Sequence, residues 1–527
     1  MVLRVEIFSA SKPKVFTFFA YTRENRVSDA VFFCAARMLF TLCDFKHFRL
    51  KTTPRVVLYN VYMPQTQECL PRTLNSVLDL VGNTPLLKVH TLDTGKCELF
   101  LKMESQNPGQ SIKDRIAITM IEKAEREGHL KKGVRIIEAT AGNTGIALAL
   151  IASQKGYEIT VVVPDKMSEA KIDHLRAMGA GVIMARSDVE KGHLEYYQDV
   201  AKRLADENGW YYINQFENDA NVEAHYTTTA PELWEQMDGK IDAVVAGVGS
   251  GGTITGLGRY LKEQNPEIEI ILADPEGSIV APLVNDGTKV SPGAWLVEGI
   301  GEDFVPPITD LDVVTSAIAI SDKESFETAR ALLKAEGILA GSSTGTLLAA
   351  ALRWCSLQTE PKRIATFVCD HGSKYLGKMF NDYWMLDQGF QDRKSYGNLR
   401  DLISRRHERK EDHTLAPNQP LIQAIKTMRL YDISQLAVVD AQENVVGIID
   451  ESDVLLAVAK NKDNFQNPCC DFMTSDLDTI RADASIDELV PLFAEDKVAI
   501  VLDETDNFLG LITKIDLINH LRRQLPR

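Results

Sequence analysis

The chain has 527 residues, of which 45% are hydrophobic and 25% charged, and its formal net charge is -16. This length predicts two to four domains, and the acidic balance excludes a general nucleic-acid or anionic-membrane binder, because such proteins need a basic face. No uninterrupted apolar run of about eighteen residues occurs, so no membrane span is expected. The eight cysteines show no C-x-x-C spacing. Free thiols in a cytoplasmic protein are therefore expected.

The chain begins with an extension, residues 1–73, that is rich in Phe, Lys and Arg and whose hydrophobic residues have no sustained period. The basic and aromatic residues favour a targeting segment. A non-homologous extension, with Met63 as the true initiator, is the alternative. Neither interpretation predicts a packed fold.

From Leu74 to Trp384, short apolar runs alternate with helical segments. This alternation predicts an α/β fold, in which parallel sheets are buried on both faces by helices. The strands are expected at 134–137, 159–163, 243–245, 268–272 and 364–368, and the main helices at 114–127, 145–155, 168–178 and 323–336.

Lys113 lies in the segment NPGQSIKDR, Asn107–Arg115, just before the first of these helices. Loop residues precede Lys113, and Asp114 is suited to the start of a helix. This pattern predicts that Lys113 lies at the mouth of the fold and not in its core. A lysine at such a position can bind a carbonyl cofactor covalently. A solvated surface lysine is the alternative when the segment is taken alone.

A second loop, Glu138–Gly145 with the sequence EATAGNTG, connects a predicted strand to a predicted helix. Its backbone N–H groups, hydroxyls and carboxamide can hold an anion such as a carboxylate. An ordinary N-capped helix entry is the alternative.

A third loop, AGVGSGGTITG at 246–256, contains a literal G-x-G-x-x-G after an apolar run. Asp274 follows at the distance of a ribose-binding carboxylate, which is the pattern of a dinucleotide site. The alternative is a single phosphate held by backbone N–H groups at a helix N-terminus, with help from the hydroxyls of Ser250 and Thr253.

Residues 385–414 are polar and basic, and we interpret them as a linker with a short helix. An internal repeat follows: residues 436–456 match residues 499–519 at a constant offset. Each unit is predicted to run helix, strand, turn, strand, helix. Two such units can bury their apolar faces against each other.

The motifs SIKDR, TAGNTG, GVGSGGT and GILAGSSTG occur in this order between Ser111 and Gly345. In this order and spacing they resemble the β-family (fold-type II) of pyridoxal-phosphate enzymes, which includes cysteine synthases and cystathionine β-synthases. The C-terminal repeat resembles a pair of CBS domains. Such a pair joined to this catalytic domain is the domain organisation of cystathionine β-synthases. The resemblance implies a two-subdomain, parallel-sheet catalytic domain at 74–384, a linker at 385–414, and α+β CBS domains at 415–465 and 466–527.

The resemblance also implies roles for individual residues. Lys113 resembles the lysine that binds pyridoxal 5′-phosphate covalently, a residue with no role in hydride transfer, which argues against the dinucleotide interpretation. Asn143 resembles the contact to the cofactor 3′-oxygen, and Ser343 the hydroxyl that faces the pyridine nitrogen. The phosphate loop corresponds to Gly249, Ser250, Gly251, Gly252 and Thr253, and the substrate-carboxylate loop to Thr140, Ala141, Gly142, Asn143 and Thr144, with Gln215 nearby.

The implied reaction joins L-serine and L-homocysteine to give L-cystathionine and water, with Lys113 as the base. A cysteine synthase using O-acetylserine and sulfide is the alternative, and a CBS-domain ligand sensor with a degenerate catalytic half is the alternative from another class. Three departures from the family pattern blur the choice of substrate. Ala141 replaces the usual Ser, and Phe216 and Glu302 stand where the haem-containing synthase has Tyr.

Cys34 and His47 lack the surroundings of the family's haem segment, so we expect neither haem nor metal. In the repeat, Thr513 and Asp516 keep the adenosyl-binding pattern of CBS domains. The equivalent of Asp516 is Asp453, which is preceded by Asp450 in place of the hydroxyl. Asp450 would repel a phosphate but not a cationic ligand such as S-adenosylmethionine. The alternative is a structural pair without a ligand, and a homodimer or homotetramer is expected.

Overall fold

The computed structural model describes residues 2–7, 14–19, 73–140, 142–165, 167, 169–186, 188–189, 192–495 and 497–523. The chain separates into two compact units, Met1–Ser76 and Val77–Arg527. In the first unit, β1 (Val2–Ile7) pairs antiparallel with β2 (Lys14–Phe19), so part of the extension adopts regular backbone structure although no packed fold is expected there. Met63 lies outside the described residues.

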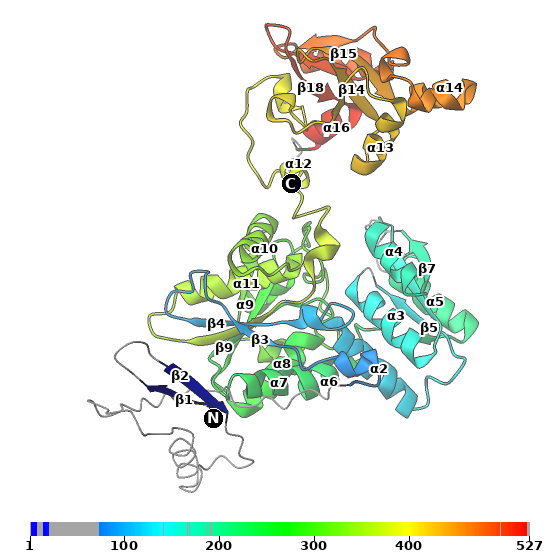
Figure 1. Ribbon diagram of the computed structural model, residues 1–527. Helices are drawn as coiled ribbons and strands as arrows, with labels where there is room; N and C mark the ends of the chain where they lie inside the picture. Colours follow the sequence, from blue (N-terminus) through cyan, green and yellow to red (C-terminus); the bar gives the residue numbers. More distant parts are fainter. Residues whose placement is uncertain are drawn as a thin grey trace, which may run out of the picture. The chain divides into compact units, whose positions relative to one another are not determined.

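The second unit begins with two sheets, each flanked by helices (Figure 1). The larger sheet has the order β11-β10-β9-β12-β4-β3 and is parallel except for β3, and the smaller, β7-β6-β5-β8, is wholly parallel. The larger sheet is built from β3 (Leu86–Lys88), β4 (Glu98–Lys102), β9 (Ala243–Ala246), β10 (Glu269–Pro275), β11 (Ser316–Ile320) and β12 (Arg363–Phe367). The smaller is built from β5 (Ile136–Ala139), β6 (Ile159–Pro164), β7 (Gly181–Ala185) and β8 (Tyr211–Tyr212).

Helices follow most of these strands, as the alternating pattern predicts. They are α2 (Lys113–Arg126), α3 (Asn143–Lys155), α4 (Glu169–Ala177), α5 (Tyr197–Asn208), α6 (Asp219–Ala224), α7 (Ala230–Gln236), α8 (Gly252–Gln264), α9 (Val280–Asp286), α10 (Asp322–Glu336), α11 (Ser342–Ser356) and α12 (Asp382–Asp387). A π-helical turn, His225–Thr229, joins α6 to α7. Every residue of β5, β6 and β9 is buried, because helices cover both faces of a parallel sheet. The two-subdomain α/β architecture expected from the sequence, with parallel sheets covered by helices, is confirmed. Across the described ranges, no helix is both long and apolar enough to cross a membrane.

The C-terminal repeat forms two sheets of the same topology. In each, the first two strands are parallel, the last two are antiparallel, and the register shifts at equivalent residues, Val438 and Val501. Asp440 and Asp503 accept hydrogen bonds from the backbone N–H groups of their own turns, which explains why both repeats keep them. The elements are β13 (Thr414–Leu415), α13 (Leu421–Tyr431), β14 (Gln435–Val439), β15 (Val445–Asp450) and α14 (Glu451–Lys460), then β16 (Thr479–Arg481), α15 (Leu489–Ala494), β17 (Ala499–Leu502), β18 (Phe508–Ile512) and α16 (Lys514–Arg523).

The segment expected to be a linker, 385–414, contributes to the core of the second repeat. Leu399, Leu402 and Ile403 are buried in one apolar cluster with residues such as Leu489 and Val501. After the end of α12, the segment contains two short 3-10 turns rather than a further α-helix. Its polar composition gives no periodic signal for these three contacts.

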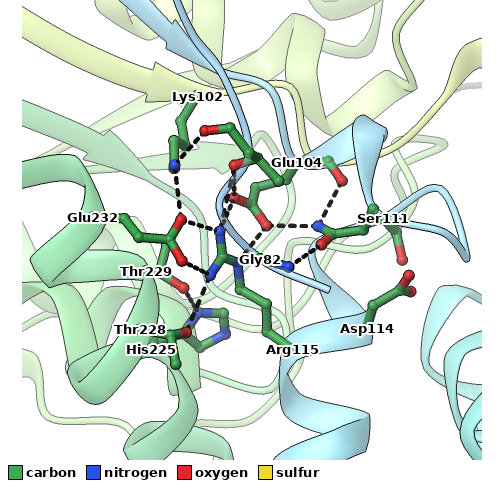
Figure 2. Close-up of polar contacts among 12 residues, drawn as sticks. Gly82, Lys102, Glu104, Ser111, Asp114, Arg115, His225, Thr228, Thr229 and Glu232 are labelled. Carbon is green, nitrogen blue, oxygen red and sulfur yellow. Dashed lines mark hydrogen bonds and ion pairs between the residues drawn. The ribbon is translucent and has the colours of Figure 1, made fainter. Parts of the chain in front are cut away.

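A buried ion network fixes α2 to the larger sheet and to α7 (Figure 2). Arg115, which is 2% exposed, donates paired hydrogen bonds of 2.7–2.8 Å to the carboxylates of Glu104 and Glu232. Lys102 Nζ donates to Glu232 Oε2 at 2.9 Å and to the Thr84 carbonyl at 2.7 Å. Two cations therefore balance two carboxylates. The Arg115 guanidinium, beside Lys102, holds the pKa of Glu232 down to about 2, against the opposing effect of burial.

We expect Arg115→Met to lower the free energy of unfolding by about 3–5 kcal/mol, because it leaves two buried carboxylates with one cation. Urea denaturation of the full chain would measure the loss. Adding Glu104→Gln should recover part of it, since Lys102 and Glu232 then remain as a balanced pair. The control is Arg186→Met at an exposed ion pair with Asp188, which should cost below about 1 kcal/mol. Equal losses at Arg115 and Arg186 would contradict the network's role.

Candidate active site

Four helices begin at one cavity between the two sheets. Lys113 is the first residue of α2, Asn143 the first of α3, Gly252 the first of α8, and Ser343 the second of α11. Lys113, Asn143, Ser343 and the glycine loop all line the cavity, which encloses about 540 Å³ including space open to solvent. Helix N-termini carry partial positive charge and free N–H groups. The cavity is thus suited to an anionic ligand of small-molecule size.

Side chains at two positions of the glycine loop 247–252 would clash with neighbouring atoms. Gly251 has a φ of +87°, and a Cβ there would lie 1.9 Å from Thr309 Oγ1. A Cβ on Gly249 would lie 2.4 Å from the carbonyl oxygen of Gly299. Both positions therefore require glycine, and the loop's backbone N–H groups are left accessible at the start of α8.

Two hydroxyls at this loop have unused hydrogen-bonding capacity. Thr309 Oγ1 is buried and lacks a partner among the described residues. Ser250 Oγ accepts a hydrogen bond of 2.8 Å from Asn221 Nδ2, so its own hydrogen remains free to be donated. A buried hydroxyl without a partner is costly unless a ligand satisfies it. A phosphate group, which only accepts hydrogen bonds from such donors, fits this set.

Lys113 carries an amine suited to nucleophilic chemistry. Burial lowers its pKa, although Cys369, Glu302 and Asp370 act in the opposite direction. A lowered pKa raises the fraction of neutral amine, which is the form that attacks a carbonyl or takes a proton.

Asn143 is held by residues that the sequence motifs did not reveal. Its Nδ2 donates to Asp370 Oδ2 at 2.9 Å, and its Oδ1 accepts from Lys374 Nζ at 2.7 Å. The second hydrogen of Nδ2 stays available for the cavity. Tyr375 also donates to Asp370 Oδ2, at 2.8 Å. Asp370 and Lys374 thus fix both the position and the orientation of the Asn143 amide.

The loop before α3 is anchored by Gln215 and Glu138. Thr144 Oγ1 donates to Gln215 Oε1 at 2.8 Å, and both residues are buried. Glu138 accepts hydrogen bonds from the N–H groups of Asn214 and Gln215, while burial raises its pKa to about 8. Thr140 Oγ1 accepts a long hydrogen bond of 3.5 Å from the N–H of Gly142, the residue that caps α3. Ala141, a predicted substrate-binding residue, lies outside the described residues.

Ser343 shares the cavity wall with Cys369, a residue that sequence reasoning treated only as a free thiol. The two side chains lie within hydrogen-bonding reach of each other. Burial raises the pKa of the Cys369 thiol to about 12. The cavity therefore presents a neutral hydroxyl and a neutral thiol on this side.

Asp274, the candidate ribose ligand, is fully buried and accepts a hydrogen bond of 2.8 Å from the Ala281 N–H. Its carboxylate holds the start of α9 and is not presented to a ligand, which argues further against a dinucleotide site. The departures Phe216 and Glu302 do not belong to the cavity lining. Phe216 packs against Phe304 with 5.6 Å between ring centroids, and Glu302 is close enough to Lys113 for each to influence the other's pKa.

The predicted adenosyl residues differ between the repeats. Asp516 accepts hydrogen bonds from Thr513, through both N–H and hydroxyl, and from the Ser404 hydroxyl. Asp453 instead forms a reciprocal capping box with Asp450 at the start of α14. Within the described ranges, no cluster of three His, Cys, Asp or Glu side chains is placed to hold a metal ion. Cys34 and His47 lie outside those ranges.

Comparisons with known proteins agree with this geometry. The family profile described as "Pyridoxal-phosphate dependent enzyme" matches residues 77–370, and that described as "CBS domain" matches 400–460 and 469–523. Cystathionine beta-synthase from Oryctolagus cuniculus is 35% identical over 472 residues, 85% of each chain. Cysteine synthase from Staphylococcus aureus is 39% identical but covers only 58% of this chain. A solved hydrogen sulfide-producing enzyme from Fusobacterium nucleatum matches with a TM-score of 0.54 and 38% identity, over 58% of this chain and 100% of its own.

Pyridoxal phosphate fits the residues at this cavity. The glycine loop and the hydroxyls of Ser250 and Thr309 suit its phosphate, the buried amine of Lys113 suits its aldehyde, and the Ser343 hydroxyl adds a polar group to the cavity wall. The glycine loop, the lysine and the paired C-terminal repeats are all accounted for by one assignment. The chain belongs to the cystathionine β-synthase family of pyridoxal-phosphate-dependent enzymes.

Proposed function

We propose that the chain catalyses β-replacement, joining L-serine and L-homocysteine to give L-cystathionine and water. The observation that carries the proposal is the position of Lys113, whose buried side chain lines a cavity at which four helices begin. Similarity to cystathionine β-synthases over 85% of the chain, through the CBS pair, supports this reaction over that of the shorter cysteine synthases.

The cofactor, when bound, supplies an electron sink for the Cα of the substrate amino acid. Lys113 would hold this group covalently until the substrate binds, and its freed amine would then remove the Cα proton of serine. Lys113 would pass that proton to the β-hydroxyl, which leaves as water. It would take the proton of the homocysteine thiol as the sulfur bonds to Cβ, and would deliver that proton to Cα. Lys113 thus serves in turn as covalent anchor, base and acid.

The remaining roles are proposed from the family resemblance and are supported by local contacts. Backbone N–H groups between Thr140 and Thr144 bind the substrate carboxylate, and Gln215 holds Thr144 in place. Ser343 meets the ring nitrogen with a neutral hydroxyl, which leaves the ring largely unprotonated and favours elimination at Cβ. Asn143 contributes its remaining N–H to the cofactor 3′-oxygen.

Glu302 favours an amino acid over sulfide as the second substrate. Burial raises the pKa of this carboxyl well above its usual range, and Lys113 acts against that rise. A substrate that carries an ammonium group would stabilise the ionised form of this carboxyl, whereas sulfide offers no such partner. Homocysteine has such a group, and sulfide does not.

Lys113→Ala should abolish the visible absorbance that pyridoxal phosphate shows when bound covalently to the protein. Among the described residues that line the cavity, Lys113 is the only lysine. Absorption spectra of the purified wild type and variant would test this. Lys123→Ala is the control and should keep the colour, because Lys123 lies on the same helix as Lys113 but pairs with Glu223 of α6 at a partly buried position outside the cavity lining. A yellow Lys113→Ala protein, or a colourless wild type that does not take up the cofactor, would contradict the assignment.

Steady-state assays with serine or O-acetylserine as first substrate, and homocysteine or sulfide as second, test the reaction itself. We expect the highest kcat/KM for serine with homocysteine. Glu302→Gln should lower kcat/KM for homocysteine by about tenfold and leave that for sulfide nearly unchanged, because it removes one charge-assisted hydrogen bond. A preference for O-acetylserine and sulfide would support the cysteine synthase alternative. Absence of all four activities in a cofactor-loaded chain would favour the ligand-sensor alternative.

The CBS pair is proposed to bind an adenosyl ligand chiefly through Asp516. Ser404 and Thr513 already satisfy this carboxylate, so a ribose diol would have to replace the Ser404 contact. In the other repeat, the Asp450 carboxylate disfavours a phosphate and tolerates a sulfonium.

Exposed apolar side chains on α14 and α16, such as Leu455 and Ile515, support the proposed homodimer or homotetramer. The unpaired cysteines of the described residues support a cytoplasmic location.

Calorimetric titration of the full chain with S-adenosylmethionine, AMP and ATP should show tightest binding of S-adenosylmethionine. Asp516→Ala should abolish that binding, and Ser404→Ala should tighten it by several-fold, because the competing hydroxyl is gone. Asp503→Ala, which disturbs a turn in the same repeat, is the control and should leave affinity close to wild type. Binding of none of the three ligands would leave the pair a structural role, and tighter binding of AMP would refute the charge argument.

A further inference from the structure

His225 connects the glycine loop to the π-helical turn between α6 and α7. The side chain is fully buried, with Nδ1 2.9 Å from Thr229 Oγ1 and Nε2 3.1 Å from Thr253 Oγ1 (Figure 2 shows the contact to Thr229). Thr253 lines the cavity in the first turn of α8. A π-turn within a run of α-helix is uncommon and often marks a functional position. Here it places a histidine behind a cavity-lining hydroxyl.

The imidazole ring reaches this position because α8 and the π-turn approach very closely. A Cβ on Gly256, one turn into α8, would lie 2.7 Å from His225 Cβ and from the Val222 carbonyl oxygen. Only glycine fits there. The same turn is held on its other side by Arg115, which donates to Thr228 Oγ1 at 3.1 Å. The turn therefore links the buried ion network of Lys102, Glu104, Arg115 and Glu232 to the first turn of α8.

His225 is neutral in this setting. Burial lowers its pKa well below the usual value, and the nearby cations Lys113 and Arg115 act in the same direction. A neutral imidazole has one N–H donor and one nitrogen acceptor. One of its two hydroxyl partners must therefore accept a hydrogen bond from the ring, and the other must donate one to it.

The direction of the hydrogen bonds is set by the ligand. A phosphate dianion accepts hydrogen bonds only, so the Thr253 hydroxyl must donate its single hydrogen to it. Thr253 Oγ1 then accepts from His225 Nε2–H, and His225 Nδ1 accepts from the Thr229 hydroxyl. We propose that His225, as the Nε2–H tautomer, is a positioning residue that fixes Thr253 as a phosphate donor. This inference rests on the proposed cofactor site.

The test compares binding of pyridoxal phosphate and pyridoxal to the full-length chain after removal of cofactor. His225→Leu should weaken pyridoxal phosphate binding by about tenfold, because one charge-assisted hydrogen bond loses its orientation, and should change pyridoxal binding by less than about twofold. Thr253→Val should give a similar loss, and the double variant should bind no more weakly than Thr253→Val alone. His225→Gln, whose amide nitrogen occupies the place of Nε2, should restore most of the affinity.

Tyr226→Phe, at an exposed neighbour in the same π-turn, is the matched control and should bind both compounds as wild type does. If His225→Leu fails to fold, Thr229→Val keeps the ring but removes its orienting donor, and should weaken only pyridoxal phosphate. Equal losses for pyridoxal and pyridoxal phosphate, additive losses in the double variant, or normal cofactor affinity in both His225→Leu and Thr229→Val would overturn the inference. A wild type that binds neither compound would instead refute the cofactor assignment itself.

Discussion

The active site depends on the buried ion network of Lys102, Glu104, Arg115 and Glu232, in which two cations balance two carboxylates. Two carboxylates and two cations are removed from water together, and their mutual attraction does little more than offset the cost of that removal. What the network supplies is a fixed geometry. Glu104 follows β4, Glu232 lies on α7 and Arg115 lies on α2, so the three elements can meet in only one arrangement. Lys113, two residues before Arg115, is placed by that arrangement.

The network explains why the SIKDR segment performs two tasks in five residues. Lys113 faces the cavity, and Arg115 points the other way into the protein interior. Between them, Asp114 is buried and accepts a hydrogen bond from the Gly109 N–H, while burial raises its pKa to about 7. The sequence pattern identified Asp114 as a helix start, and the helix begins one residue earlier. Its role in closing the preceding loop, and the entire role of Arg115, involve partners distant in sequence.

Sequence reasoning succeeded where a signal is local. Buried strands such as β6 and β9, the helices that follow them and the two repeats all leave periodic patterns, and the four motifs mark the loops at the cavity. It missed Thr309, Cys369, Asp370 and His225, which reach the site from segments without a motif. These residues are single polar or small side chains, and nothing in their neighbourhood distinguishes them from others of the same type. Only the folded chain brings them next to the motif residues.

The repeats show that equal topology need not mean equal chemistry. Both units share strand order, the position of the register shift and the aspartate that closes the hairpin turn. The helix starts differ, because Asp450 and Asp453 satisfy each other while Asp516 pairs with Thr513 and with Ser404 from outside the repeat. The shared features form the strands and the hairpin turn of the fold, whereas the two helix starts differ in their hydrogen-bond partners.

Cys369 has a consequence for an enzyme proposed to use a thiol substrate. A thiol in the cavity wall would compete with the incoming nucleophile, or form a mixed disulfide with it, if it ionised readily. With a pKa of about 12, only on the order of one Cys369 side chain in 10⁵ is a thiolate at neutral pH. The thiolate is the reactive form in exchange and oxidation. The burial of this sulfur therefore protects the site from its own chemistry, and it should make the enzyme tolerant of disulfides and mild oxidants at this position.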